Sequence, residues 1–222
     1  MTAVLPAPFE VKDCALITLA TGRSAHNLRE LRDHAADVPL DSLRHHFYEA
    51  LLRPSFDDPE FGNDFAVWAH EALRDDALAE RLSALDPVDH PDGEALRTAL
   101  VDVLEDRLAE LPNVPVAPPG HDFHFLSSRI VVFASGQRAR NPAELAALVG
   151  RLPAGSVFFH FVEARLRPPR GEDDFSAWLA HWGEQGVEAR WRLSVIDPMF
   201  GSLGDLRERV ADALAAANGG PK

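Results

Sequence analysis

A histidine, a glutamate and an arginine recur twice in the chain with the same spacing, His-x-x-Glu-x-x-x-Arg. The two sets are His46, Glu49 and Arg53, then His160, Glu163 and Arg167. At about 100° per residue, each set would lie along one face of an α-helix. Histidine and glutamate at i, i+3 can reach one metal ion, and two such pairs would supply four ligands. The pattern therefore predicts a candidate ligand-binding site, with metal binding by the two His-Glu pairs as one version of it.

The same residues have a purely structural interpretation. His46 and His160 share the apolar stripe of their segments, so each could be buried and hydrogen-bonded by a polar neighbour. Glu49 precedes Arg53 by four residues, which is the favourable order for an ion pair along a helix. Because two ligand-type residues on one helix recur by chance, the structural interpretation is the simpler one.

Two aspartates open a second repeated motif, Asp-Phe-x-x-Trp. Asp64 and Asp174 are predicted to be helix N-caps, because a carboxylate there accepts free N–H groups and complements the helix dipole. The alternative is a catalytic or ligand-binding carboxylate, so both residues stay among the candidate ligand-binding residues. The tryptophans of this motif, Trp68 and Trp178, are predicted to anchor the core.

These motifs belong to an internal duplication. Phe9–Ala50 aligns without a gap with Phe123–Ala164. We therefore expect repeat unit 1 at residues 9–111, a proline-rich connector at 112–122 and repeat unit 2 at 123–217. One copy alone would expose strand edges and an apolar helix face. The two copies are therefore expected to pack as one pseudo-dimeric domain with pseudo-twofold symmetry.

Each copy is expected to begin with short strands and to continue as four helices. Apolar stretches at 15–20 and 129–134 predict strands that end at Gly22 and Gly136. Asn27 and Asn141 are predicted to cap the next helix, and the His-Glu-Arg motif lies on the helix after that. The expected fold class is α+β, predominantly α-helical, with a small β-sheet.

Composition excludes several classes of function. The net charge is −13, Lys12 and Lys222 are the only lysines, and basic residues form no run, so binding to a nucleic acid is not expected. The single cysteine, Cys14, allows no internal disulfide. Neither a secretory leader nor a membrane-spanning stretch is recognisable, so a soluble, cytoplasmic protein is expected. Phosphate-binding loops, nucleophile elbows and His-Glu-x-x-His are absent from the sequence.

The repeated motifs resemble a prokaryotic family catalogued as domain of unknown function 5752. The resemblance rests on Asn27-Leu-Arg-Glu-Leu31, His46-Phe-x-Glu49 and Asp64-Phe-x-x-Trp68, and on a second round that includes Phe159–Arg165 and Asp174–Trp178. It covers about residues 9–215 and supports the architecture. It implies no activity, cofactor or partner.

The function predicted from the residues is a non-catalytic or regulatory binding module with a cleft between its two repeats. The first alternative is a metal-dependent, hydrolase-like enzyme that uses the paired His-Glu helices. The second is a structural protein whose acidic surface meets a basic partner. Trp182 and Trp191 occur only in the second copy, so they either belong to an asymmetric pocket or reflect sequence drift.

Overall fold

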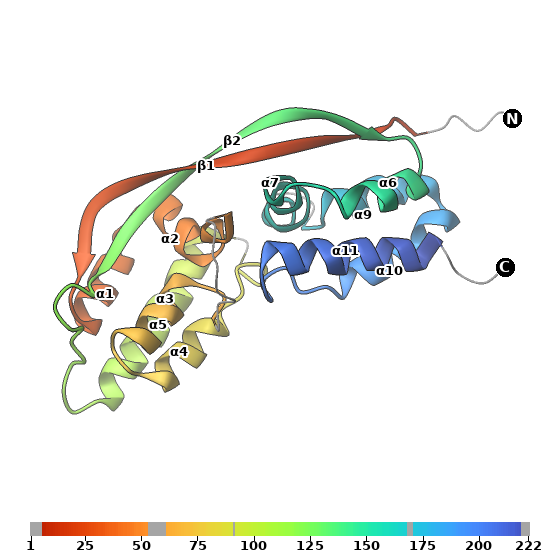
Figure 1. The fold of residues 1–222 in the computed structure, drawn as a ribbon. Coiled ribbons are helices and arrows are strands. Elements are labelled where there is room, and N and C mark those ends of the chain that lie inside the picture. Colours follow the sequence, from red (N-terminus) through yellow and green to blue (C-terminus); the bar gives the residue numbers. More distant parts are fainter. Residues whose placement is uncertain (1–5, 53–60, 91, 168–170, 219–222) are drawn as a thin grey trace, which may run out of the picture. The chain divides into compact units, whose positions relative to one another are not determined.

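The computed structural model describes residues 6–52, 61–90, 92–167 and 171–218 (Figure 1). The predicted class is confirmed, because the chain is α+β and mostly helical, with one small antiparallel sheet. Two long strands, β1 (Phe9–Ala25) and β2 (Phe123–Ala139), lie side by side and form this sheet. Among the described helices, none combines the length and the apolarity that crossing a bilayer requires.

Each strand is a single element of 17 residues, whereas the sequence predicted shorter strands that end at a glycine. Gly22 and Gly136 lie inside the strands, both with φ of 77°. A residue without Cβ adopts this conformation without strain, so each strand continues through its glycine instead of stopping there. The hydroxyl of Thr21 or Ser135 accepts the N–H of the residue that follows the glycine, Arg23 or Gln137.

The helices after β1 are short, except for the last. They are α1 (Leu28–Ala35), α2 (Leu40–Phe47), a 3-10 helix (Glu49–Leu52), α3 (Asp64–Glu71), α4 (Asp76–Ser83) and α5 (Gly93–Glu110). Those after β2 are α6 (Pro142–Val149), α7 (Ala154–Val157), a π-helix (Phe158–Glu163), α8 (Ala164–Leu166), α9 (Asp174–Leu179), a 3-10 helix (Ala180–Trp182), α10 (Glu184–Ser194) and α11 (Leu203–Asn218). The predicted caps of α1 and α6 are confirmed, since Asn27 accepts the N–H of Glu30 and Asn141 that of Glu144.

The chain forms two compact units whose limits fall inside the strands. The α1–α5 unit consists of Leu16–Ile130, and the α6–α11 unit combines the residues up to Ala15 with those from Val131 onward. Each unit therefore contains one part of β1 and one part of β2. The expected packing of the two repeats as one pseudo-dimeric domain stays a prediction.

Each unit has its own apolar core. The side chains of Phe47, Phe65, Leu31 and Leu78 are fully buried in the α1–α5 unit, together with Phe125 of β2. In the α6–α11 unit, Phe158, Phe161, Phe175 and Leu193 are fully buried, together with Val11 of β1. Each core thus includes residues of the strand that does not directly precede its helices in the sequence.

Candidate functional site

His46, in the α1–α5 unit, uses both of its ring nitrogens to join a helix to a strand. Its Nδ1 lies 2.8 Å from Oδ2 of Asp64, and its Nε2 accepts the backbone N–H of Leu126 at 2.9 Å. A nitrogen that accepts carries no proton, so the proton is on Nδ1 and is donated to the carboxylate. The ring is therefore a neutral imidazole in a fixed tautomer.

His160 repeats this arrangement in the α6–α11 unit. Its Nδ1 lies 2.8 Å from Oδ2 of Asp174, and its Nε2 accepts the N–H of Lys12 at 2.9 Å. Both histidines are almost completely buried. We call each Asp-His-strand connection a clasp: Asp64–His46–Leu126 and Asp174–His160–Lys12. In both, a helix of one repeat holds the strand of the other repeat.

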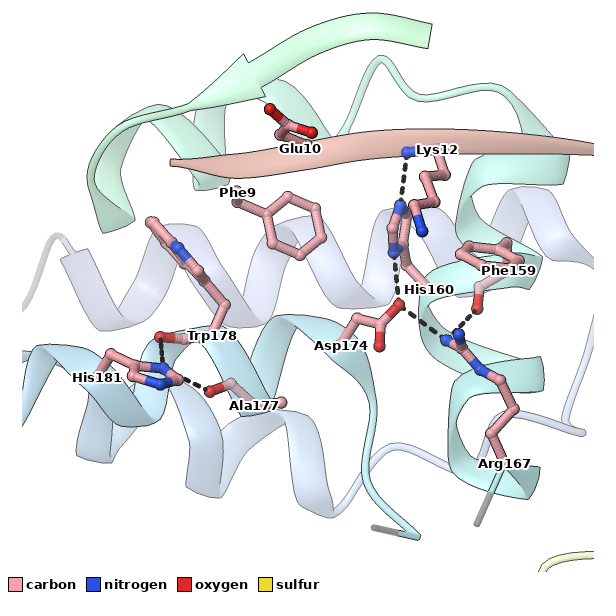
Figure 2. A pocket seen from close by; sticks show the side chains of 10 residues that line it. All are labelled: Phe9, Glu10, Lys12, Phe159, His160, Arg167, Asp174, Ala177, Trp178 and His181. Atoms are coloured by element: carbon pink, nitrogen blue, oxygen red, sulfur yellow. Dashed lines mark hydrogen bonds and ion pairs between the residues drawn. The ribbon is translucent and has the colours of Figure 1, made fainter. Parts of the chain in front are cut away.

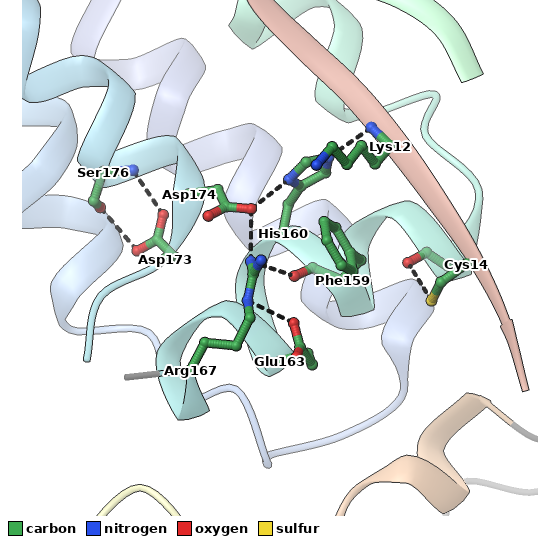
Figure 3. A network of polar contacts seen from close by, with 10 residues as sticks. Lys12, Cys14, Phe159, His160, Glu163, Arg167, Asp173, Asp174 and Ser176 are labelled. Atoms are coloured by element: carbon green, nitrogen blue, oxygen red, sulfur yellow. Dashed lines mark hydrogen bonds and ion pairs between the residues drawn. The ribbon is translucent and has the colours of Figure 1, made fainter. Parts of the chain in front are cut away.

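The predicted residues of the second copy form one connected network (Figure 3). Arg167 donates from Nη2 to Asp174 at 2.9 Å, and its Nε lies 2.7 Å from the carboxylate of Glu163. Burial acts to raise the pKa of Asp174, but the hydrogen bond from His160 and the charge of Arg167 outweigh it and hold this pKa below its usual value. The acid that accepts from His160 is therefore ionised.

The first copy does not repeat that network among its described residues. Arg53 lies outside them. Glu49 accepts a short hydrogen bond from the Ser128 hydroxyl, and Ser128 also lies 2.9 Å from Nδ1 of His45. Burial raises the pKa of Glu49, although the bond from Ser128 opposes this shift. His46 and Glu49 thus have different partners.

The backbone explains why the predicted helical face does not hold. In the first copy α2 ends at Phe47, and Glu49 begins a 3-10 helix, whereas the second motif passes through the π-helix Phe158–Glu163. Both kinds of helix change the rotation per residue from the 100° of an α-helix. The prediction of one uniform α-helix carrying the motif was therefore wrong, although His160, Glu163 and Arg167 of the second copy still belong to one network.

Asp64 and Asp174 are not the caps that the sequence predicted. Asn63 caps α3 by accepting the N–H of Ala66, and Asp173 caps α9 by accepting that of Ser176. Each predicted aspartate is instead the first residue of its helix, and its carboxylate accepts from the clasp histidine. The preceding polar residue supplies the cap and leaves the aspartate available for the clasp.

Sequence reasoning missed the roles of His45 and Ser128. His45 is buried beside His46, with ring centroids 5.0 Å apart, and Ser128 is buried on β2. His45 aligns with Phe159 of the second copy, and Ser128 aligns with Cys14 of the first, whose thiol donates to the carbonyl of Gly155 at 3.2 Å. The available signal was that the two copies differ at these positions, one of which directly precedes the shared histidine.

Among the described residues, one group has the composition of a metal site. Single ligand atoms of His45, His46 and Asp64 lie within 4.8 Å of one another. A metal on Nδ1 of His46 would require the ring proton on Nε2, which faces the N–H of Leu126. Metal binding through that atom therefore competes with the strand hydrogen bond. The second copy has Phe159 in place of His45.

A pocket of about 290 Å³ opens beside His160 in the α6–α11 unit (Figure 2). Its lining comes from both repeats: Phe9, Glu10 and Lys12 of β1, and Phe159, His160, Arg167, Asp174, Ala177, Trp178 and His181. Trp178 was predicted to anchor the core, but it is only half-buried, and its indole N–H donates to the carbonyl of Ala7 at 2.7 Å. Phe9 packs between Trp178 and His160, with ring centroids 5.9 Å and 4.9 Å away.

Two cations of this pocket lie over the same aromatic ring. Lys12 Nζ is 5.8 Å from the centroid of Phe159, and the Arg167 guanidinium carbon is 4.5 Å from it. The ring attracts both cations through its negative face and keeps them near each other. Arg167 is paired with the carboxylates of Asp174 and Glu163, so Lys12 is the cation that the pocket offers beside its apolar wall.

The lysine of this pocket has no counterpart at the aligned position. Lys12 aligns with Leu126, whereas Arg167 aligns with Arg53 and His181 with Glu71. Lys12 is also one of only two lysines in a chain that uses arginine for nearly all of its positive charge. The lysine therefore distinguishes this pocket from the aligned residues.

Two of three comparisons with known proteins find a match. The model of a family described as Family of unknown function (DUF5752) matches residues 6–215. A solved structure, "The structure of OrfY from Thermoproteus tenax", is similar to this chain with 32% sequence identity and a TM-score of 0.77. The similarity covers 96% of each chain. A search of curated proteins finds no match.

Proposed function

The chain belongs to the DUF5752 family, whose function is unknown, so its activity has to be argued from its own site. We propose that it is a non-catalytic or regulatory binding module for a small organic anion, which it binds in the pocket beside His160. The predicted cleft between the repeats stays a prediction; this pocket lies within the α6–α11 unit, where β1 and the helices that follow β2 both line it. A cytoplasmic location and the lack of a nucleic-acid partner stay predictions from the sequence.

The observation that carries the proposal is the pairing of the Lys12 ammonium with an apolar wall. Lys12 and Arg167 lie over Phe159 on one side, and Phe9 and Trp178 supply apolar surface on the other. A carboxylate or phosphate would accept from the Lys12 ammonium, while a planar apolar part would pack against the Trp178 indole. A volume of about 290 Å³ suits a ligand of the size of a substituted benzene.

A binding role also follows from the state of His160. A general base needs a ring nitrogen that can take a proton from a substrate, but Nδ1 of His160 donates to Asp174 and Nε2 accepts from the Lys12 backbone. Taking up a proton on Nε2 would place two donors opposite each other and release the strand. The histidine therefore forms a wall of the pocket and fixes the position of Lys12.

Calorimetric titration with benzoate, phenyl phosphate and inorganic phosphate tests this proposal. At least one aromatic anion should bind, and Lys12→Gln should weaken it about tenfold, because a hydrogen bond to a charged group is worth about 1.5 kcal/mol. Arg129→Gln is the control, since Arg129 is an exposed cation of β2 that does not line the pocket.

A second pair of variants tests the aromatic wall. Trp178 and Trp68 each donate an indole N–H to a backbone carbonyl at 2.7 Å, so Trp→Phe removes the same bond from each. Only the change at Trp178 should weaken binding. Absence of heat with all three probes, or equal losses in Lys12→Gln and Arg129→Gln, would refute the proposed function.

A further inference from the structure

An exposed apolar stripe runs along α10, away from the pocket. Val187 and Trp191 of α10 and its C-cap residue Val195 follow one another at i, i+4 and i+8, and their exposed fractions are 58%, 60% and 68%. At about 100° per residue the three side chains lie within roughly 80° of the helix surface. The opposite side of α10 is buried through Ala189 and Leu193. The helix is thus apolar on its packed face and on a narrow part of its exposed face.

The first repeat supplies an internal control for this stripe. Leu193-Ser194 aligns with Leu82-Ser83, which places Val187, Trp191 and Val195 opposite Asp76, Glu80 and Ala84. These three residues of the first repeat are also exposed, on α4 and just after it. The aligned helix of the α1–α5 unit, α4, therefore carries acids at two of these exposed positions. Replacement of two acids by valine and tryptophan at matching exposed positions indicates a surface that is covered in use.

The charges beside the stripe favour a second copy of this chain as the covering partner. Glu188 and Arg192 lie on one flank as an i, i+4 ion pair, 2.8 Å apart. On the other flank, Arg190 lies 3.6 Å from Glu172. The flanks are therefore locally neutral, although the whole chain carries a net charge of −13. A strongly basic partner would find no matching excess of acid at this helix.

The flank formed by Glu188 and Arg192 is also complementary in charge to the same flank of a second copy. If two α10 helices pair antiparallel around a twofold axis near Trp191, Val187 of one copy meets Val195 of the other, and the two indoles meet at the axis. The same rotation brings Glu188 of one copy beside Arg192 of the other. Opposite charges at this spacing therefore support an isologous contact in which each helix offers the same surface.

We propose that the α10 stripe of Val187, Trp191 and Val195 is the contact surface of a homodimer, formed by antiparallel pairing of α10 with a second copy. The contact is smaller than the roughly 1,600 Å² of a standard stable interface, so dimerisation should depend on protein concentration in the micromolar range. This inference does not depend on the anion pocket, whose lining residues lie outside α10.

The test is the molar mass of the full chain by sedimentation between about 1 and 500 μM, at about 0.15 M salt, where repulsion between acidic chains is screened. The mass should rise from one to two copies with concentration. Trp191→Glu, which installs the residue found at the aligned position of the first repeat, should keep the chain monomeric. Glu80→Ala on α4 is the matched control and should dimerise like the unchanged protein.

A charge exchange tests the pairing geometry. Glu188→Arg alone and Arg192→Glu alone should each weaken the dimer at least tenfold, because like charges then face each other across the axis. Mixing the two variants should restore dimers of mixed composition. A monomer at every concentration, a dimer unaffected by Trp191→Glu, or mixed variants that do not associate would overturn the proposal.

Discussion

At the scale of single residues, the two clasp histidines hold a strand rather than offer a nitrogen to a substrate. Each is a neutral imidazole, because its Nε2 accepts a strand N–H while its Nδ1 donates to an aspartate. Burying a polar ring is costly unless both nitrogens have partners, and here both do. The repeated His-Phe-x-Glu motif is thereby explained in part by folding.

Removing a clasp should therefore destabilise the fold. His160→Ala removes a buried side chain, opens a cavity and leaves the N–H of Lys12 without its acceptor, so the free energy of unfolding should fall by about 2–4 kcal/mol. His124→Ala, at an exposed position of β2, should change it by less than about 0.5 kcal/mol. Urea unfolding followed by circular dichroism measures both. Equal stability of the two variants would show that the clasp contributes little.

The buried acid of the first copy predicts a pH dependence. Burial raises the pKa of Glu49 in the folded state, so the folded chain binds more protons than the unfolded chain, and Glu49 lowers stability as the pH rises above about 4.5. The side chain of Glu49→Gln cannot ionise, so this loss of stability disappears, and its amide oxygen can still accept the hydrogen bond from the Ser128 hydroxyl. Its unfolding free energy should therefore improve relative to the unchanged protein between pH 4.5 and pH 7.

Glu110 provides a control, because its effect on stability should change with pH in the opposite direction. Hydrogen bonds from Arg81 and Arg107 hold the pKa of Glu110 below its usual value. Ionised Glu110 therefore stabilises the folded chain at pH values above its usual pKa, and this stabilisation is lost as the pH falls. Glu110→Gln should lose stability relative to the unchanged protein as the pH rises. Urea unfolding series from pH 4 to pH 7 distinguish the two variants; parallel pH profiles would contradict the assignment.

At the scale of elements, the strands are longer than their sequences predict because a glycine lets each one bend without ending. Gly22 and Gly136 both have φ of 77° and lie at aligned positions. The sequence pattern correctly indicated that the regular strand conformation is interrupted at these glycines. What the pattern could not show is whether the chain pairs again beyond them, since that depends on a partner strand more than 100 residues away.

The conformation of these glycines gives a prediction at the same scale. Gly136→Ala should lower the free energy of unfolding by about 1 kcal/mol, because a Cβ disfavours positive φ even though nothing lies within 4 Å of its position. Gly150→Ala is the control, since Gly150 ends α6 with φ of −60° and an added Cβ meets only Ala211 at 3.6 Å. Thermal unfolding should separate the two, and a more stable Gly136→Ala protein would be inconsistent with this conformation.

At the scale of the whole molecule, each compact unit combines a run of consecutive helices with parts of both strands. The core of each unit includes residues of the strand that does not directly precede its helices in the sequence, as Phe125 and Val11 show. The pocket follows the same rule, because β1 residues meet helices of the second repeat there. The two copies then differ where function is proposed, at Lys12 in the pocket and at Trp191 on α10.

The sequence by itself determined the fold class, the helix caps Asn27 and Asn141 and the family, because these depend on short-range patterns and on whole-chain similarity. It also selected His160, Glu163, Arg167 and Asp174, which the structure connects. Only the tertiary structure decided that a strand N–H occupies Nε2 of each clasp histidine, and that Lys12 and Trp178 share a pocket. The physical reason is that these contacts join residues more than 75 positions apart, and no local periodicity records which strand covers which helices.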